Sequence, residues 1–149
     1  MIRTLSKTFY IFTMEVKDLK PALIWQCFDE ITKVPRPSCH EEKIREYLLK
    51  FASEHDIAVK TDAVGNVVMS KPATPGCEGA PTVILQAHMD MVAEKNNDTV
   101  HDFLKDPIQT YIDGDWVKAR GTTLGADNGI GMAAAMAALI DPDLMHGPL

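Results

Sequence analysis

The stretch that most constrains the fold is an apolar segment that runs into two polar side chains. Residues 82–87 are mostly apolar and of β type, and they lead directly into His88-Met89-Asp90. In an extended chain, side chains two residues apart point to the same face, so we expect His88 and Asp90 to lie side by side. A carboxylate beside an imidazole fixes the tautomer of a metal-binding histidine. The pattern therefore favours a strand that ends at a metal site, although such an ending is often only a solvated loop.

A second polar position, Asp127, lies where a glycine-rich loop turns into an apolar helix. Four glycines occur within residues 121–131, and residues 133–140 are typical of a buried helix. The positive end of a helix dipole favours a carboxylate, so the simplest interpretation of Asp127 alone is a helix cap. A carboxylate can also bridge two cations, and flanking glycines let the backbone approach them closely. Neither stretch is decisive alone, but together they indicate a metal site.

Both stretches resemble motifs of the aminoacyl-histidine dipeptidases, which are Xaa-His (carnosine-splitting) dipeptidases in the aminoacylase/carboxypeptidase superfamily of two-zinc peptidases. The resemblance rests on VILQAHMDMVAEKN at residues 83–96 and on KARGTTLGADNGIGMAAAMAAL at residues 118–139. It extends from about Met14 to Leu149 and includes residues 31–38. It implies that the family enzyme hydrolyses the peptide bond of Xaa-His dipeptides with the help of bound metal.

The resemblance also implies a role for each candidate site residue. By position in the motifs, His88 binds one zinc, Asp127 bridges two zincs, and Asp90 serves catalysis by steadying His88. The implied cofactor is Zn²⁺, two ions per complete site, with Mn²⁺ or Co²⁺ as alternatives for carboxylate-rich ligands. The family's Glu-Glu pair, a further Asp ligand and a distant His ligand would follow Leu149. The peptide bond between Asp127 and Asn128 is expected to be cis.

The resemblance further implies a fold and a domain organisation. Residues 14–149 are expected to form the N-terminal part of an α/β catalytic domain, a three-layer α/β/α arrangement with a mixed sheet. Residues 1–13 are predicted to be a disordered extension. The family enzyme is expected to be a cytoplasmic homodimer that pairs through a domain absent from this sequence. Because ligands and general base are missing, we expect this chain alone to be inactive.

The charge is distributed unevenly along the chain. Residues 1–81 carry 11 Lys and Arg against 11 Asp and Glu, whereas residues 82–149 carry 4 against 10. The acidic second half disfavours nucleic acid as a partner, which needs a basic face. It suits cation binding, but it equally suits ordinary solubility. The three cysteines have no C-x-x-C spacing and indicate a reduced, cytoplasmic protein. No apolar run is long enough to span a membrane.

Two alternatives to a peptidase remain open from the sequence. Residues 129–134 fit the dinucleotide-binding pattern G-x-G-x-x-A at the start of a helix. However, no strand runs directly into the first glycine, and Asp127 would place a negative charge beside a pyrophosphate. The other alternative is a non-catalytic fragment with a partial cation site. Competition between NAD and a metal ion would distinguish these classes.

Helical spacing of apolar residues predicts two helices near the start of the chain. The first is expected to be capped by Asp18, with Pro21 in its first turn. The second is expected to open with a capping box formed by Ser38 and Glu41. The apolar residues that should face the core are Ala22, Trp25, Phe28 and Ile31 in the first helix, and Ile44, Tyr47, Leu48 and Phe51 in the second.

Two hairpins are predicted from short β-type runs that flank turn residues. The first joins residues 57–60 to residues 66–69 across an Asp-Ala-Val-Gly turn. The second joins residues 108–112 to residues 116–119 across Asp-Gly-Asp. Helices interleaved with such strands argue for an α/β chain with a mixed sheet.

Overall fold

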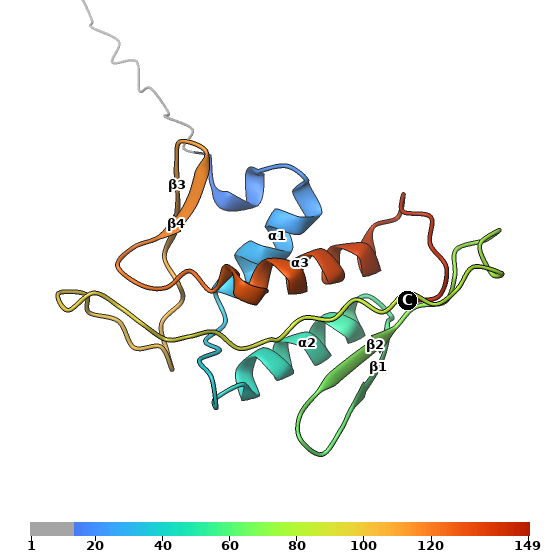
Figure 1. Ribbon diagram of the computed structural model, residues 1–149, viewed down its shortest axis with the longest axis horizontal. Helices are drawn as coiled ribbons and strands as arrows, with labels where there is room; N and C mark the ends of the chain where they lie inside the picture. Colours follow the sequence, from blue (N-terminus) through green and yellow to red (C-terminus); the bar gives the residue numbers. More distant parts are fainter. Residues whose placement is uncertain (1–13) are drawn as a thin grey trace, which may run out of the picture.

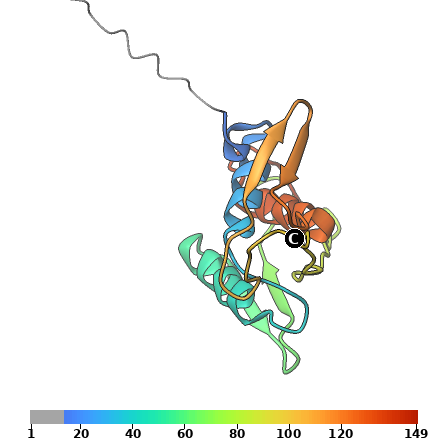
Figure 2. The same cartoon turned by 90° about the vertical axis from the view of Figure 1, so that its left-hand side faces the viewer.

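The computed structural model describes residues 14–149, so the extension predicted for residues 1–13 lies outside the described part (Figure 1). Three α-helices pack together, and two small hairpins lie at opposite ends of this group (Figure 2). In chain order, the elements are η1 (Val16–Asp18), α1 (Ala22–Thr32), α2 (Glu42–Glu54), β1 (Ala58–Thr61), β2 (Val67–Ser70), β3 (Thr110–Asp113), β4 (Trp116–Ala119) and α3 (Ala126–Ile140).

The core forms where α1 packs against α3, with α2 and its hairpin adding a second layer. Phe28 and Ile31 of α1 are 1% and 0% exposed, as their helical spacing predicts. On α3, the small residue Ala133 is 0% exposed and lies among buried methionines, which lets the two helices approach closely. From α2, the residues Ile44, Leu48, Phe51 and Ala52 complete the cluster.

The predicted cap of the first helix is wrong. Asp18 lies in η1, where its carboxylate accepts a hydrogen bond from the Glu15 backbone N–H at 3.0 Å. Its carboxylate is therefore used one turn too early to cap α1. Pro21 is the residue before α1 and has extended backbone angles. It needs no partner for an N–H that it lacks, which makes it compatible with a helix start.

The predicted capping box of the second helix is also wrong. The Ser38 hydroxyl donates to Asp90 Oδ2 at 2.6 Å, so it is not available to the backbone of α2. The helix begins at Glu42, after Glu41, whose carboxylate accepts from the Cys39 backbone N–H at 2.6 Å. A tertiary contact with a residue far along the chain has replaced the local cap.

Both predicted hairpins are present as separate two-stranded antiparallel sheets. In the first, Val59 pairs with Met69, and in the second, Ile112 pairs with Val117. The apolar side chains of each hairpin that face inward pack against the helical core. The two sheets do not join, so the single mixed sheet and the three-layer arrangement are not observed within residues 14–149.

The predicted strand over residues 82–87 is not observed either. The segment crosses the helices as an extended chain, drawn yellow-green in Figure 1. Among the described residues, the one backbone–backbone hydrogen bond of residues 82–87 runs from the Val83 N–H to the Pro148 carbonyl at 3.0 Å. The nearest bridge, between Met91 and Pro37, lies beyond the segment. A strand needs a ladder of such bonds to a neighbour. The sequence predicted the extended conformation but not the missing neighbours.

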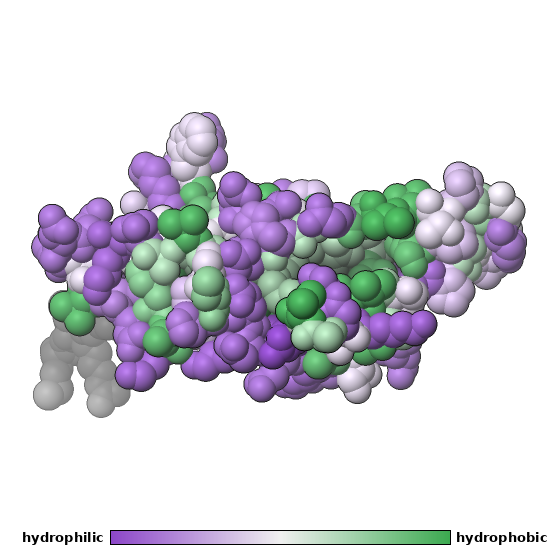
Figure 3. All heavy atoms as spheres, turned by 60° about the horizontal axis from the view of Figure 1, so that its bottom comes forward, coloured by the Kyte–Doolittle hydropathy of each residue, from purple (hydrophilic) through white to green (hydrophobic). Residues whose placement is uncertain are grey.

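The same segment leaves an apolar run in contact with solvent. Val83, Ile84 and Leu85 are 47%, 85% and 50% exposed. Other apolar patches interrupt the hydrophilic surface on the face drawn in Figure 3. Within residues 14–149, no helix combines the length and the apolar character that a membrane crossing requires.

The packing of α1 against α3 yields a stability prediction. We expect Ile31→Ala to lower the free energy of unfolding by about 2–5 kcal/mol, because a fully buried side chain leaves a cavity. The control is Val64→Ala in the turn between β1 and β2, where the side chain is 84% exposed and a change within about 0.5 kcal/mol is expected. Urea unfolding followed by circular dichroism measures both, and equal effects would contradict the core assignment.

Candidate metal site

The structure brings His88 and Asp127 together from two distant parts of the chain. His88 Nε2 lies 3.1 Å from Asp127 Oδ1, although 39 positions separate the two residues. The prediction that these side chains converge is therefore confirmed. Both are accessible to a ligand, since 48% of the His88 side chain and 97% of the Asp127 side chain are exposed.

Asp90 holds the other nitrogen of the same imidazole. His88 Nδ1 lies 3.0 Å from Asp90 Oδ1 and 3.1 Å from the Asp90 carbonyl oxygen. Both of these oxygens are acceptors, so this hydrogen-bond network assigns the ring proton to Nδ1. The second oxygen of Asp90 accepts from the Ser38 hydroxyl at 2.6 Å. Asp90 thus fixes both the tautomer and the orientation of His88, and Ser38 fixes Asp90.

This tautomer leaves two electron-pair donors facing one another. When Nδ1 carries the only ring proton, Nε2 presents a lone pair to the Asp127 carboxylate oxygen. Two acceptors at 3.1 Å repel unless a cation lies between them, either a proton on Nε2 or a metal ion. Zinc bonds of about 2.0–2.2 Å from each atom could reach one ion across this separation. The donor pair therefore fits one edge of a metal site.

Asp127 owes its position to an irregular start of α3. Asp127 and Asn128 have non-helical backbone angles within the helix range, and the peptide bond between them is cis, as predicted. Gly125 precedes the helix in the left-handed conformation, with φ of 71°. No side-chain hydrogen bond caps the helix, so the simple interpretation of Asp127 as an N-cap is not supported.

The pKa shifts agree with these contacts. The hydrogen bond with the Asp127 carboxylate is the largest cause that raises the pKa of His88, and contacts with Asp90 add to it against burial. The hydrogen bond from the Ser38 hydroxyl is the largest cause that lowers the pKa of Asp90. The Asp127 carboxylate therefore stabilises a positive charge at His88, and the Ser38 hydroxyl stabilises a negative charge at Asp90.

Arg36 contacts the backbone beside both site residues, and the sequence interpretation did not assign it this role. Its side chain is buried, and its Nη2 donates to the Gly125 carbonyl at 2.6 Å. Its Nη1 donates to the carbonyls of Met89 and Asp90 at 3.2 and 3.1 Å. The only sequence signal was an arginine between two prolines in a segment that follows a helix. Ser38 was assigned to a cap instead.

The donor set seen here is small. Among the described residues, no group of three or more His, Cys, Asp or Glu side chains is placed to hold a metal ion.

The structure gives no support to a dinucleotide site at residues 129–134. Gly129 is buried within α3, and a Cβ at this position would lie 2.6 Å from Nη2 of Arg36. Close packing against Arg36 accounts for this glycine.

Known proteins support the predicted resemblance to dipeptidases. Over 135 residues the chain is 58% identical to the cytosol non-specific dipeptidase of Escherichia coli (strain K12), which covers 91% of this chain and 28% of that protein. The crystal structure of aminoacylhistidine dipeptidase from Vibrio alginolyticus matches with a TM-score of 0.89 and 55% identity, and covers 92% of this chain and 28% of that one. The resemblance is confirmed, and the chain spans about 28% of the length of these relatives.

More distant structures share the fold alone. A tripeptidase from Staphylococcus aureus matches with a TM-score of 0.66 at 21% identity over 85% of this chain and 34% of its own length. An aminopeptidase from Bacillus cereus matches with a TM-score of 0.67 at 23% identity over the same shares of the two chains. No protein-family model matches the chain. The residues described here therefore adopt an arrangement that several peptidases contain.

The contact between His88 and Asp127 predicts a titration effect in metal-free protein. We expect the pKa of His88 to lie above its ordinary value and to fall in Asp127→Asn, because the amide removes the charge that stabilises the imidazolium. Asp115→Asn, in the turn of the β3–β4 hairpin, is the control and should leave that pKa unchanged. NMR titration of the histidine ring resonances measures it. An unchanged pKa in Asp127→Asn would show that the two side chains do not interact in solution.

Proposed function

We propose that this chain, which closely matches part of two dipeptidases, contributes part of a divalent metal site to a metal-dependent dipeptidase. The observation that carries the proposal is the separation of 3.1 Å between His88 Nε2 and Asp127 Oδ1, with Nδ1 occupied by Asp90. Two lone pairs that face one another at this distance are stabilised by a cation between them, and we propose that a metal ion replaces the proton there. Zn²⁺ is the proposed ion, with Mn²⁺ or Co²⁺ as alternatives, since imidazole and carboxylate bind all of them.

Each of the four site residues has a defined role in this proposal. His88 donates the Nε2 lone pair, and Asp127 donates carboxylate oxygens to one or to two ions. Asp90 keeps the proton on Nδ1, and Ser38 keeps Asp90 in the orientation that does so. When bound, the metal supplies Lewis-acid chemistry: it polarises a peptide carbonyl and lowers the pKa of water. The exposure of Asp127 leaves room for a peptide to approach the ion.

The proposed substrate is a dipeptide, with Xaa-His dipeptides as the specific class. This class comes from the names of the relatives, one described as a non-specific dipeptidase and one as an aminoacylhistidine dipeptidase. The cytoplasm is the proposed location, because the Escherichia coli relative is named as a cytosolic protein. A homodimer and the absence of nucleic acid partners stay predictions from the sequence.

The finer fold prediction is part of the same proposal. The side chains from Val83 to Leu85 are apolar and exposed. Such a continuous apolar run is typical of a strand in a parallel sheet, where both faces of the strand are buried. We propose that residues 82–90 become a strand of a three-layer α/β/α domain when neighbouring strands are supplied. The matching dipeptidase from Vibrio alginolyticus is longer, since this chain covers 28% of it, so further segments of that protein could supply such neighbours.

Metal binding tests the ligand assignment. We expect Zn²⁺ or Co²⁺ to bind the purified chain, and we expect His88→Ala to weaken binding by more than about 10-fold. Loss of a residue that only orients a metal ligand already costs about 10-fold in affinity, so loss of the ligand itself should cost more. The control is His55→Ala, since His55 follows α2 and packs on Phe51. Isothermal titration calorimetry with EDTA-treated protein measures both. Equal affinities for the two variants would remove His88 from the site, and competition by NAD would favour the dinucleotide alternative.

A chimera tests the enzymatic function. The 135 matching residues of this chain replace their counterparts in the Escherichia coli dipeptidase. We expect the chimera to hydrolyse L-carnosine or another Xaa-His dipeptide in a metal-dependent manner, because this chain supplies the ligands that the remainder lacks. Release of free histidine is the readout.

Two comparisons make the chimera decisive. The unfused 149-residue chain should show no turnover, because catalytic zinc needs about three protein ligands and the chain offers two at this point. His88→Ala within the chimera should reduce turnover by at least about 100-fold, whereas His55→Ala should not. A soluble, folded chimera without activity, or activity that survives His88→Ala, would contradict the proposed role.

A further inference from the structure

We propose that Arg36 is a positioning residue for the metal site, which sets the separation of His88 and Asp127 by holding the backbone beside both. This inference rests on the proposed function, because it concerns the same site. Arg36 itself does not touch the proposed ion: its donors bind carbonyl oxygens of the polypeptide. Its effect would pass through the two segments that carry the ligands.

The contacts of Arg36 join three parts of the chain that are far apart in sequence. Nη1 binds the carbonyls of Met89 and Asp90, which immediately follow His88. Nη2 binds the carbonyl of Gly125, two residues before Asp127. A planar guanidinium fixes the angle between its donors, so one side chain determines how far apart these carbonyls lie. Apart from the proposed ligands His88 and Asp127, no other side chain in the described residues makes hydrogen bonds to both ligand-bearing segments.

The backbone at Gly125 and Gly129 packs closely against the guanidinium of Arg36. A Cβ at Gly125 or at Gly129 would lie 2.6 Å from Nη2 of Arg36. Both positions are therefore restricted to glycine by the guanidinium itself. Glycines before and after Asp127 thus allow the start of α3 to pack directly against Arg36. The position of the Arg36 guanidinium therefore influences the position of the proposed ligand Asp127.

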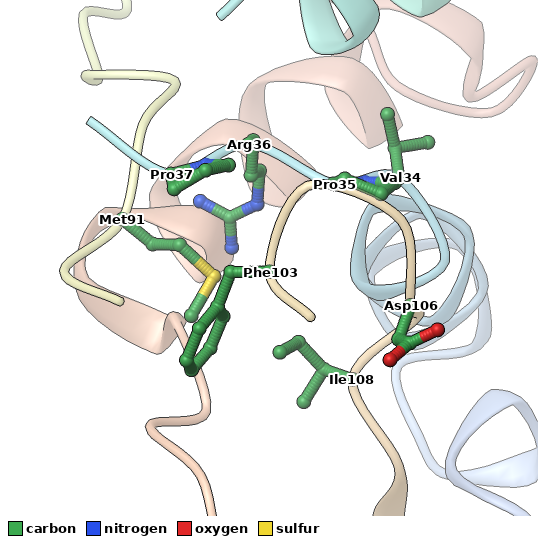
Figure 4. A pocket seen from close by; sticks show the side chains of 8 residues that line it. All are labelled: Val34, Pro35, Arg36, Pro37, Met91, Phe103, Asp106 and Ile108. Atoms are coloured by element: carbon green, nitrogen blue, oxygen red, sulfur yellow. The ribbon is translucent and has the colours of Figure 1, made fainter. Parts of the chain in front are cut away.

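Burial makes these contacts rigid. Arg36 is 1% exposed, and burial lowers its pKa to about 10. A buried guanidinium is costly unless its donors are satisfied, so loss of any carbonyl contact is strongly disfavoured. Its Nε lacks a protein partner. Figure 4 shows the guanidinium pointing toward the side chains of Met91 and Phe103, beside a cavity of about 10 Å³, which has room for about one water molecule.

The arginine fork predicts a specific failure on substitution. Lysine keeps the charge but has a single ammonium, which cannot span the carbonyls on both sides in a fixed geometry. We therefore expect Arg36→Lys to remain folded and to bind Co²⁺ about 10- to 100-fold more weakly, the range for groups that orient metal ligands. The visible absorption of bound Co²⁺ should also change, because it reports the geometry of the ligands.

The experiment compares matched variants of the full 149-residue chain, each checked by circular dichroism. Arg45→Lys on α2 is the charge-matched control and should bind Co²⁺ like the unchanged chain. Gly129→Ala is a second probe that displaces Nη2 without removing Arg36, and it should weaken binding by a smaller factor. Gly79→Ala is its control, since a Cβ there meets nothing within 4 Å.

The outcomes separate this inference from the proposed function. If His88→Ala and Asp127→Ala leave Co²⁺ affinity unchanged, the proposed metal site fails. If those variants lose binding while Arg36→Lys keeps both affinity and spectrum, the role of Arg36 is overturned. If Arg36→Lys does not fold, Gly129→Ala decides: unchanged affinity and spectrum in that variant would overturn the inference, and a loss would support it.

Discussion

The packing of α1 against α3 is the contact on which the rest of the structure depends. Phe28 and Ile31 on one helix lie in the same buried cluster as Ala133 and Ala137 on the other, and this packing holds α3 in place. Because Asp127 lies at the start of α3, the position of a solvent-exposed carboxylate is determined by an apolar interface behind it. Arg36 lies at the edge of the same interface and connects it to the segment of His88.

Local patterns predicted most elements of this fold, because periodicity and turn residues act over a few positions. The spacing of Phe28 and Ile31 identified the first helix, and the turn chemistry identified both hairpins. The sequence also predicted that His88 and Asp127 meet, but that came from the resemblance to a family. Nothing in local spacing relates two residues 39 positions apart.

The errors arose where a tertiary contact replaced a local one. Ser38 fits a helix cap in sequence, but its hydroxyl binds Asp90, which is 52 positions away. Arg36 had no assigned role in the sequence, and only the fold reveals that its donors are used by distant carbonyls. The predicted strand failed for a related reason: an extended conformation is local, but a ladder of hydrogen bonds depends on a neighbouring segment.

The extended run at residues 82–90 has a consequence for the handling of this chain in solution. It presents unpaired backbone groups together with the exposed side chains of Val83, Ile84 and Leu85. Such an edge is a template on which a second copy can add by main-chain pairing, in competition with correct partners. Pairing between copies is second order in concentration, whereas folding of one chain is first order. Dilution therefore favours the monomer, and concentrated stocks favour self-association that begins at this segment.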